Sequence, residues 1–82
     1  MNTLPATILT PFTCPLTGEI MRDPTILVET GLSYEKNAIL NWINEHRTDP
    51  ATGLPLTNLR TVPNPGLRGL IDALRASGQI QD

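Results

Sequence analysis

Two proline-containing stretches decide the fold of this chain: FTCPLTGEIMRDP at residues 12–24 and DPATGLPLTNL at residues 49–59. Each contains an Asp-Pro pair, and proline fixes its own φ angle and keeps the preceding residue out of the helical region. Both stretches are therefore predicted to be preorganised loops. They flank one central segment, predicted to be helical, that ends in Asn41, Trp42 and Ile43.

The two loops carry more apolar residues than solvated connectors require: Leu16, Ile20, Met21, Leu54 and Leu56. We expect some of these to cover a core and a few to face another molecule, because surplus exposed apolar side chains mark interaction surfaces. A hydrophobic docking surface framed by two rigid loops favours a protein partner over a small molecule.

Length and composition predict one small domain that is stabilised by packing and polar networks. A chain of 82 residues buries only about 60–65% of its unfolded surface, so its core is marginal. A single cysteine, Cys14, excludes an internal disulfide, and together with the single histidine, His46, it excludes a four-ligand Cys/His zinc site. We therefore expect no metal ion and no other cofactor.

The charge pattern disfavours nucleic acid and membranes as partners. The formal net charge is −2, and the Lys and Arg residues are scattered, which gives no basic footprint. No apolar run approaches the roughly 20 residues of a membrane span, and residues 1–10 lack the pattern of a signal peptide. The expected location is a reducing, soluble compartment.

Local patterns predict a hairpin followed by the central helix. Residues 25–28 and 32–34 read as two short strands joined by a turn. Ser33 is a candidate N-cap for a helix over residues 34–46, with Glu35 in its first turn. Ala38, Ile39, Trp42 and Ile43 fall on one stripe of this helix, and Ile39 and Ile43 are expected to be its buried residues.

In the second half of the chain, the residue patterns predict a short strand and a terminal amphipathic helix. Residues 60–63 form the expected strand, and Asn64-Pro65 is an N-cap followed by proline at the first helical position. Gly78 is expected to end the helix. The apolar positions of this helix recur at i, i+3, i+4 and i+7, and are Leu67, Leu70, Ile71 and Leu74. Leu70 is expected to be a core residue.

These patterns divide the chain into three parts. Residues 1–11 are read as a Thr/Pro-rich lead-in without predicted structure, residues 12–78 as the domain, and residues 79–82 as a tail. No internal repeat is present in the sequence.

The order of these elements resembles a U-box domain. The segments CPLTGEIMRDP, SYEKNAILNWI, DPATGLPLT and VPN occur in the order and spacing of that family, from Phe12 to roughly Ser77. The resemblance implies an α+β fold like that of RING fingers, with a small antiparallel sheet, a central helix and two cross-braced loops in which hydrogen bonds and ion pairs replace zinc. It also implies binding of a ubiquitin-conjugating enzyme charged with ubiquitin, and promotion of ubiquitin transfer from its thioester to substrate lysines without a covalent intermediate on the domain.

The resemblance implies five contact residues for the conjugating enzyme. Leu16 corresponds to the aliphatic residue of the first loop, Trp42 to a contact on the central helix, and Pro50 to the proline of the second loop, with Thr17 and Pro55 as secondary members. The residues alone leave another role open for three of them: Leu16 could belong to the core, Trp42 could be a packed indole, and Pro50 could only shape its turn.

Loop bracing is expected from Asp23, Asp49 and Asn64, with Glu19, Arg22 and Lys36 as further members of a polar network. Because isolated surface ion pairs contribute only about 0–1 kcal/mol, a solvated role for any one of them stays open. A thioester-forming role for Cys14 is disfavoured, because nothing in the sequence places His46 or a carboxylate beside it and free cysteine usually behaves as a small buried hydrophobe.

One position departs from the family pattern. Active members often carry a basic or hydrogen-bonding residue in the second loop that bridges the conjugating enzyme and ubiquitin, and Gly53 stands at that position here. Arg47 and Asn58 are possible substitutes. The alternative function is a non-catalytic interaction or oligomerisation module, which could form a homodimer. The expected location is the cytoplasm or nucleus, or the host cytosol for a bacterial effector, and the protein substrate is not specified by the sequence.

Overall fold

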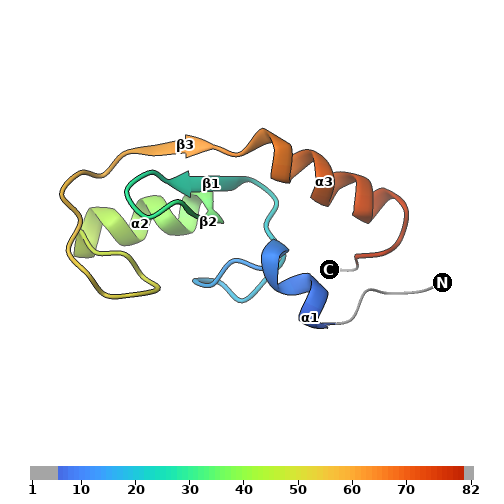
Figure 1. Cartoon of the computed structure of the whole chain (residues 1–82), viewed down its shortest axis with the longest axis horizontal. Coiled ribbons are helices and arrows are strands. Elements are labelled where there is room, and N and C mark those ends of the chain that lie inside the picture. The colour runs from blue at the N-terminus through green and yellow to red at the C-terminus, as the bar shows by residue number, and fades with distance from the viewer. Residues whose placement is uncertain (1–5, 81–82) are drawn as a thin grey trace.

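A three-stranded antiparallel sheet lies at the centre of the computed structural model, which describes residues 6–80 (Figure 1). The strands are β1 (Pro24–Leu27), β2 (Leu32–Glu35) and β3 (Thr61–Pro63), in the order β2-β1-β3. Ile26 of β1 pairs with Ser33 on one side and with Val62 on the other. The predicted hairpin, the predicted third strand and the α+β class are thereby confirmed.

The central helix α2 (Lys36–His46) begins two residues later than predicted. The predicted N-cap, Ser33, is wrong because β2 continues to Glu35, which pairs with Pro24. The Ser33 hydroxyl instead accepts a hydrogen bond from Asn64 Nδ2 at 3.3 Å. Glu35 occupies the cap position with extended backbone and makes no side-chain cap, so its carboxylate is available for the first loop.

The terminal helix α3 (Pro65–Ala76) begins as predicted, with Asn64 Oδ1 accepting a hydrogen bond from the Leu67 amide. Gly78 follows the helix with a φ of +79°, and its amide donates to the carbonyl of Arg75. Beyond it, Ile80 is 3% exposed and belongs to the core. The last part of the expected tail, residues 81–82, lies outside the described residues.

Two short helical turns lie where no structure was predicted: α1 (Ala6–Leu9) and η1 (Thr10–Phe12), the second of which ends at the first residue of the predicted domain. The buried ring of Phe12 and the partly buried side chain of Leu9 hold this segment against the core. The Thr13 hydroxyl also donates to the carbonyl of Leu9 at 2.9 Å. The rest of the expected lead-in, residues 1–5, lies outside the described residues.

The core joins the sheet, the two long helices and the first loop. Its buried apolar members are Phe12, Cys14, Met21, Leu27, Tyr34, Ile39, Ile43, Ile71 and Ile80. Leu70 was predicted to be a core residue, and this is wrong, because its side chain is 49% exposed. Only a narrow stripe of α3 faces the core. Successive helical residues are about 100° apart, so a stripe defined by Leu67, Ile71 and Leu74 leaves Leu70 at its solvent edge.

In the described part of the chain, no helix has the length and apolarity needed to cross a membrane. Residues 6–80 also contain no group of three or more His, Cys, Asp and Glu side chains placed to hold a metal ion.

Candidate protein-binding site

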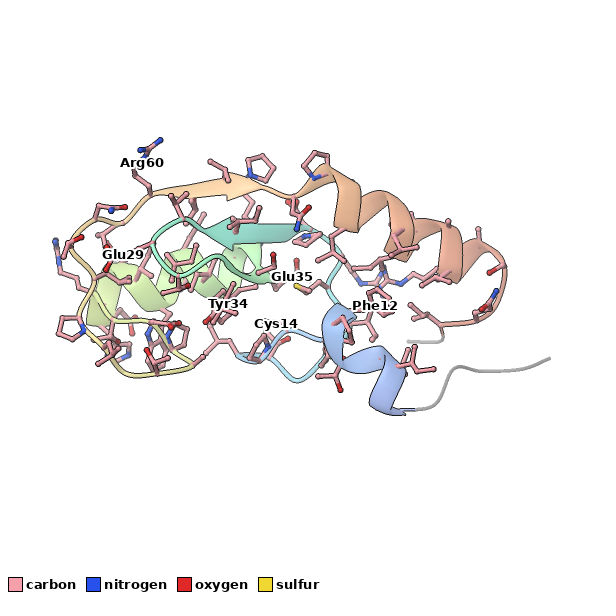
Figure 2. All side chains as sticks on the ribbon, in the orientation of Figure 1. Phe12, Cys14, Glu29, Tyr34, Glu35 and Arg60 are labelled. Atoms are coloured by element: carbon pink, nitrogen blue, oxygen red, sulfur yellow. The ribbon has the colours of Figure 1, made fainter. Side chains whose placement is uncertain are left out.

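Strand β2 holds both loops through two neighbouring residues. The phenol of Tyr34 donates a hydrogen bond to Oδ1 of Asp49 in the second loop. The backbone amide of Glu35 donates to Sγ of Cys14 in the first loop at 3.2 Å. Figure 2 shows Cys14, Tyr34 and Glu35 on the side of the sheet that faces the two loops. The relative position of the two loops is therefore set by one strand.

The first loop is held from two sides. The carboxylate of Glu35 accepts hydrogen bonds from the amides of Arg22 and Asp23, each at 2.8 Å. From the other side, the guanidinium of Arg75 on α3 donates to the carbonyls of Ile20 and Met21 at 3.4 and 3.3 Å. Hydrogen bonds to charged groups contribute more than neutral ones, so these contacts fix the loop conformation.

Asp23, one of the expected bracing residues, takes part through its backbone. Its amide donates to Glu35, and its carbonyl accepts from the Lys36 amide at 3.1 Å. Asn64, another expected bracing residue, caps α3 and reaches Ser33. It therefore connects α3 to β2, and its backbone amide donates to the carbonyl of Pro24, at the end of the first stretch, at 2.9 Å.

The second loop is organised around Asp49, the third expected bracing residue. Its side chain is fully buried. Oδ1 accepts from the Tyr34 phenol and from the Ala51 amide, and Oδ2 accepts from the Thr52 hydroxyl at 3.1 Å. Burial, together with the Asp49 carboxylate, raises the pKa of Tyr34 far above its usual range, so the phenol keeps the proton that it donates.

Glu29, in the hairpin turn, holds the end of the second loop. Its Oε1 accepts from the amide and hydroxyl of Thr57 at 2.9 and 2.6 Å, and from the amide and Nδ2 of Asn58 at 3.2 and 3.3 Å. From the sequence, Glu29 was predicted to lie in a turn and Glu35 in a helix, and neither was predicted to brace a loop. The one available signal was the presence of one glutamate in the predicted turn and another directly after the second predicted strand.

The residues expected to contact a partner lie on these two loops and on α2. Leu16 is half-buried against the core, and Thr17 is exposed and accepts a hydrogen bond from the Glu19 amide. Pro50 is half-buried directly after Asp49, and Pro55 is exposed and pairs with Thr48 in an isolated bridge.

Trp42 is half-buried and connects α2 to the second loop. Its indole N–H lies 3.0 Å from the carbonyl and 3.2 Å from the hydroxyl of Thr48. Its ring contacts that of His46, with 4.1 Å between centroids. The structure thus brings Trp42 together with the second loop, and it gives the indole a structural contact in addition to its exposed edge.

Acid is expected to weaken the contact between Glu29 and the second loop. Hydrogen bonds from Thr57, and then from Asn58, hold the pKa of Glu29 below its ordinary value of 4.5. A carboxyl group with a depressed pKa adds stability above its unfolded pKa, and this stability is lost as the pH falls through the folded pKa. The wild-type chain should therefore lose more of its Tm between about pH 7 and about pH 3 than Glu29→Gln, which does not titrate. Equal losses would show that Glu29 adds no pH-dependent stability.

The fold is that of a small α+β domain in which one strand, β2, holds two loops. The model of the U-box domain family matches residues 9–80. The chain belongs to the U-box family, whose domains are associated with ubiquitin ligases.

Named relatives share the domain but are far longer. The chain is 45% identical over 69 residues to the WD repeat, SAM and U-box domain-containing protein 1 of Gallus gallus, covering 83% of this chain and 14% of that protein. It is 44% identical over 61 residues to the U-box domain-containing protein 17 of Arabidopsis thaliana, covering 73% of this chain and 8% of that protein. The same identity and coverage hold for the U-box domain-containing protein 4 of Oryza sativa. The chain thus spans less than a sixth of these relatives.

Proposed function

We propose that this chain binds a ubiquitin-conjugating enzyme charged with ubiquitin and promotes transfer of ubiquitin from the thioester to substrate lysines, in the cytoplasm or nucleus or in a host cytosol. The observation that carries this proposal is the attachment of both loops to Tyr34 and Glu35. It gives Leu16 and Pro50 rigid supports. Rigid supports lower the entropic cost of ordering an interface, so more of the contact energy of these side chains appears as affinity.

In this proposal the domain acts by positioning. The conjugating enzyme carries the reactive thioester, so the domain contributes proximity and restraint of ubiquitin. A covalent role for Cys14 is disfavoured by its surroundings, because its side chain is fully buried and Sγ accepts a hydrogen bond from Glu35. A nucleophilic thiol needs access to its substrate.

A discharge assay tests the proposal directly. A panel of ubiquitin-charged conjugating enzymes is mixed with free lysine, and the loss of thioester is followed with and without the domain. At least one enzyme is expected to discharge faster with the domain present. Binding of an enzyme without any acceleration would favour the non-catalytic interaction module, and absence of binding across the panel would contradict the proposal.

Cys14→Ser is expected to retain the fold and the discharge activity. The serine hydroxyl can accept the hydrogen bond from the Glu35 amide in place of Sγ, and the proposed chemistry does not use the thiol. EDTA is likewise expected to leave the Tm and the rate unchanged. Circular dichroism and the discharge assay provide the measurements. A folded but inactive Cys14→Ser variant would instead support a thioester mechanism.

Gly53→Arg is expected to accelerate discharge without much change in affinity for the uncharged conjugating enzyme. In the wild-type chain, Gly53 offers no side-chain donor to bridge the enzyme and its ubiquitin, whereas arginine has five. A Cβ atom at this position meets no other atom within 4 Å, but the φ of +76° strains any L side chain. We expect the substitution to lower the free energy of unfolding by about 1 kcal/mol.

The control for this variant is Gly53→Ala, which carries the same backbone strain without the guanidinium. Both variants should show similar Tm values, and only the arginine should raise the discharge rate. If folded Gly53→Arg discharges at the wild-type rate, the bridging role lies at another residue, and Arg47 and Asn58 are the next to test.

A further inference from the structure

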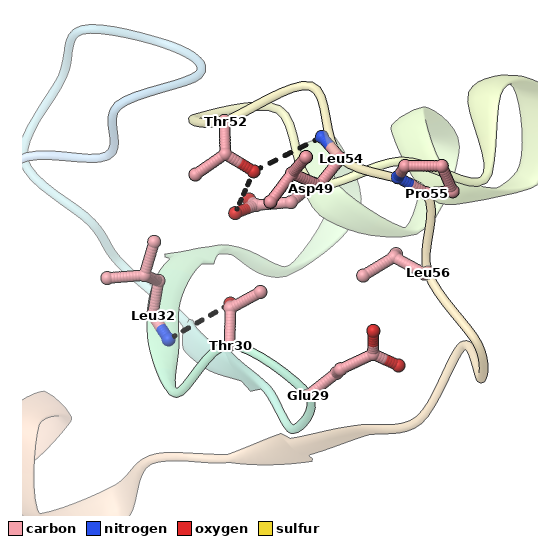
Figure 3. Close-up of a pocket in the computed structure, with 8 residues that line it drawn as sticks. All are labelled: Glu29, Thr30, Leu32, Asp49, Thr52, Leu54, Pro55 and Leu56. Carbon is pink, nitrogen blue, oxygen red and sulfur yellow. Dashed lines mark hydrogen bonds between the residues drawn. The ribbon is translucent and has the colours of Figure 1, made fainter.

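A pocket of about 380 Å³ lies between the hairpin turn and the second loop (Figure 3). The hairpin contributes Glu29, Thr30 and Leu32 to its lining. The second loop contributes the remaining lining residues, namely Asp49, Thr52, Leu54, Pro55 and Leu56. Of the expected contacts for the conjugating enzyme, only Pro55 lines this pocket.

Most polar groups of the pocket are already engaged within the protein. The Thr52 hydroxyl donates to Asp49 Oδ2 and accepts from the Leu54 amide, and the Thr30 hydroxyl accepts from the Leu32 amide. The walls offer aliphatic surface, because Leu32 is 41% exposed and Leu54 is 64% exposed. A ligand would therefore meet mainly apolar surface, and Glu29 is the charged lining residue that is not buried.

Glu29 carries a negative charge that no cation within residues 6–80 neutralises through an ion pair. Its Oε1 accepts all four hydrogen bonds from Thr57 and Asn58, and Oε2 accepts none from the described residues. None of the ion pairs within residues 6–80 involves Glu29. Figure 2 shows Arg60 pointing outward, away from Glu29. The hydrogen bonds from Thr57 lower the pKa of Glu29, so the group is ionised at neutral pH.

We propose that this pocket binds a lysine side chain presented by a partner protein. The four methylene groups of the lysine lie against Leu32 and Leu54, and the ammonium group contacts Oε2 of Glu29. Lysine and arginine bury their aliphatic stems in this way while the charged group stays at the edge. The proposal does not depend on ligase activity, and it is tested on the chain alone.

The occupancy of Oε1 favours lysine over arginine. A guanidinium group gains most from a carboxylate when two parallel hydrogen bonds reach both oxygens. At Glu29 one oxygen already accepts four hydrogen bonds, so only a single contact remains. An ammonium group is a compact point charge and does not need the second oxygen.

The test is a titration of the isotope-labelled chain, followed by amide chemical shifts, with Nα-acetyl-lysine N-methylamide as the probe. Saturable shifts are expected at Thr30, Leu32 and Leu54, with a Kd on the order of millimolar. The norleucine analogue, which lacks the ammonium group, should bind at least about tenfold more weakly. The arginine analogue should also bind more weakly than the lysine probe.

Glu29→Gln provides the matched variant. Its amide oxygen can still accept from Thr57 and Asn58, while the negative charge is removed, so lysine binding should fall at least about tenfold. Glu45→Gln removes an exposed carboxylate on α2 and should bind the probe like the wild type. If Glu29→Gln shifts the amides of Thr57 and Asn58, Leu54→Ser replaces it, because this variant removes a wall and leaves those hydrogen bonds in place.

The proposal is overturned by any of four results: no shifts with the lysine probe, shifts confined to other residues, equal binding of the norleucine analogue, or undiminished binding by Glu29→Gln. Where Leu54→Ser replaces Glu29→Gln, undiminished binding by Leu54→Ser has the same meaning. Preference for the arginine analogue would contradict the single-oxygen geometry on which the proposal rests.

Discussion

Ile39→Ala is expected to lower the free energy of unfolding by about 2–5 kcal/mol, because it removes a fully buried side chain from the centre of the core. A domain of this size has a total stability of only about 4–12 kcal/mol, so a substantial fraction is lost. Urea unfolding followed by circular dichroism measures the change.

Leu70→Ala is the matched control for this variant. It removes a similar apolar group from a side chain that is 49% exposed, and it should cost less than about 1 kcal/mol. Equal destabilisation by both substitutions would show that the exposed edge of α3 is covered in solution.

Leu16→Ala is expected to weaken binding of the cognate conjugating enzyme at least about 30-fold, which corresponds to about 2 kcal/mol. The wild-type affinity should be on the order of micromolar, as is typical for small transient interfaces. Titration calorimetry measures the affinity, and a melting curve of the free domain accompanies it. The Tm should change little, because Leu16 is only half-buried.

Trp42→Ala should weaken the same interaction by a similar factor, but it should also lower the Tm, because the indole N–H holds Thr48. Trp42→Phe separates the two effects by keeping an aromatic surface without the donor. Leu70→Ala again serves as the control, since it lies outside the expected contact surface. If Leu16→Ala binds the conjugating enzyme with wild-type affinity, the contact surface lies elsewhere on the domain.

The elements that were predicted from the sequence depend on local patterns. The hairpin follows from a β-branched run, a turn and a returning strand, and the start of α3 follows from Asn64-Pro65. The register of β3 on β1 joins residues far apart in the sequence, and only the existence of that strand was predicted.

The features that the sequence analysis missed depend on long-range contacts. Glu35 binds amides 12 and 13 residues before it, and Glu29 binds groups 28 and 29 residues after it. No periodicity encodes such partners. The error at Leu70 has a related cause, because helical spacing gives the position of an apolar stripe but the neighbouring elements determine its width.

The attachment of both loops to Tyr34 and Glu35 also has a consequence for native-state hydrogen exchange. The amides of Arg22 and Asp23 lie in a loop, but they donate to a side chain of the sheet, so they should exchange together with the hairpin as one cooperative unit. The first loop, which carries part of the proposed docking surface, should therefore open together with the centre of the domain. A core substitution such as Ile39→Ala would reduce the population of binding-competent molecules and leave the contacts of each folded molecule unchanged.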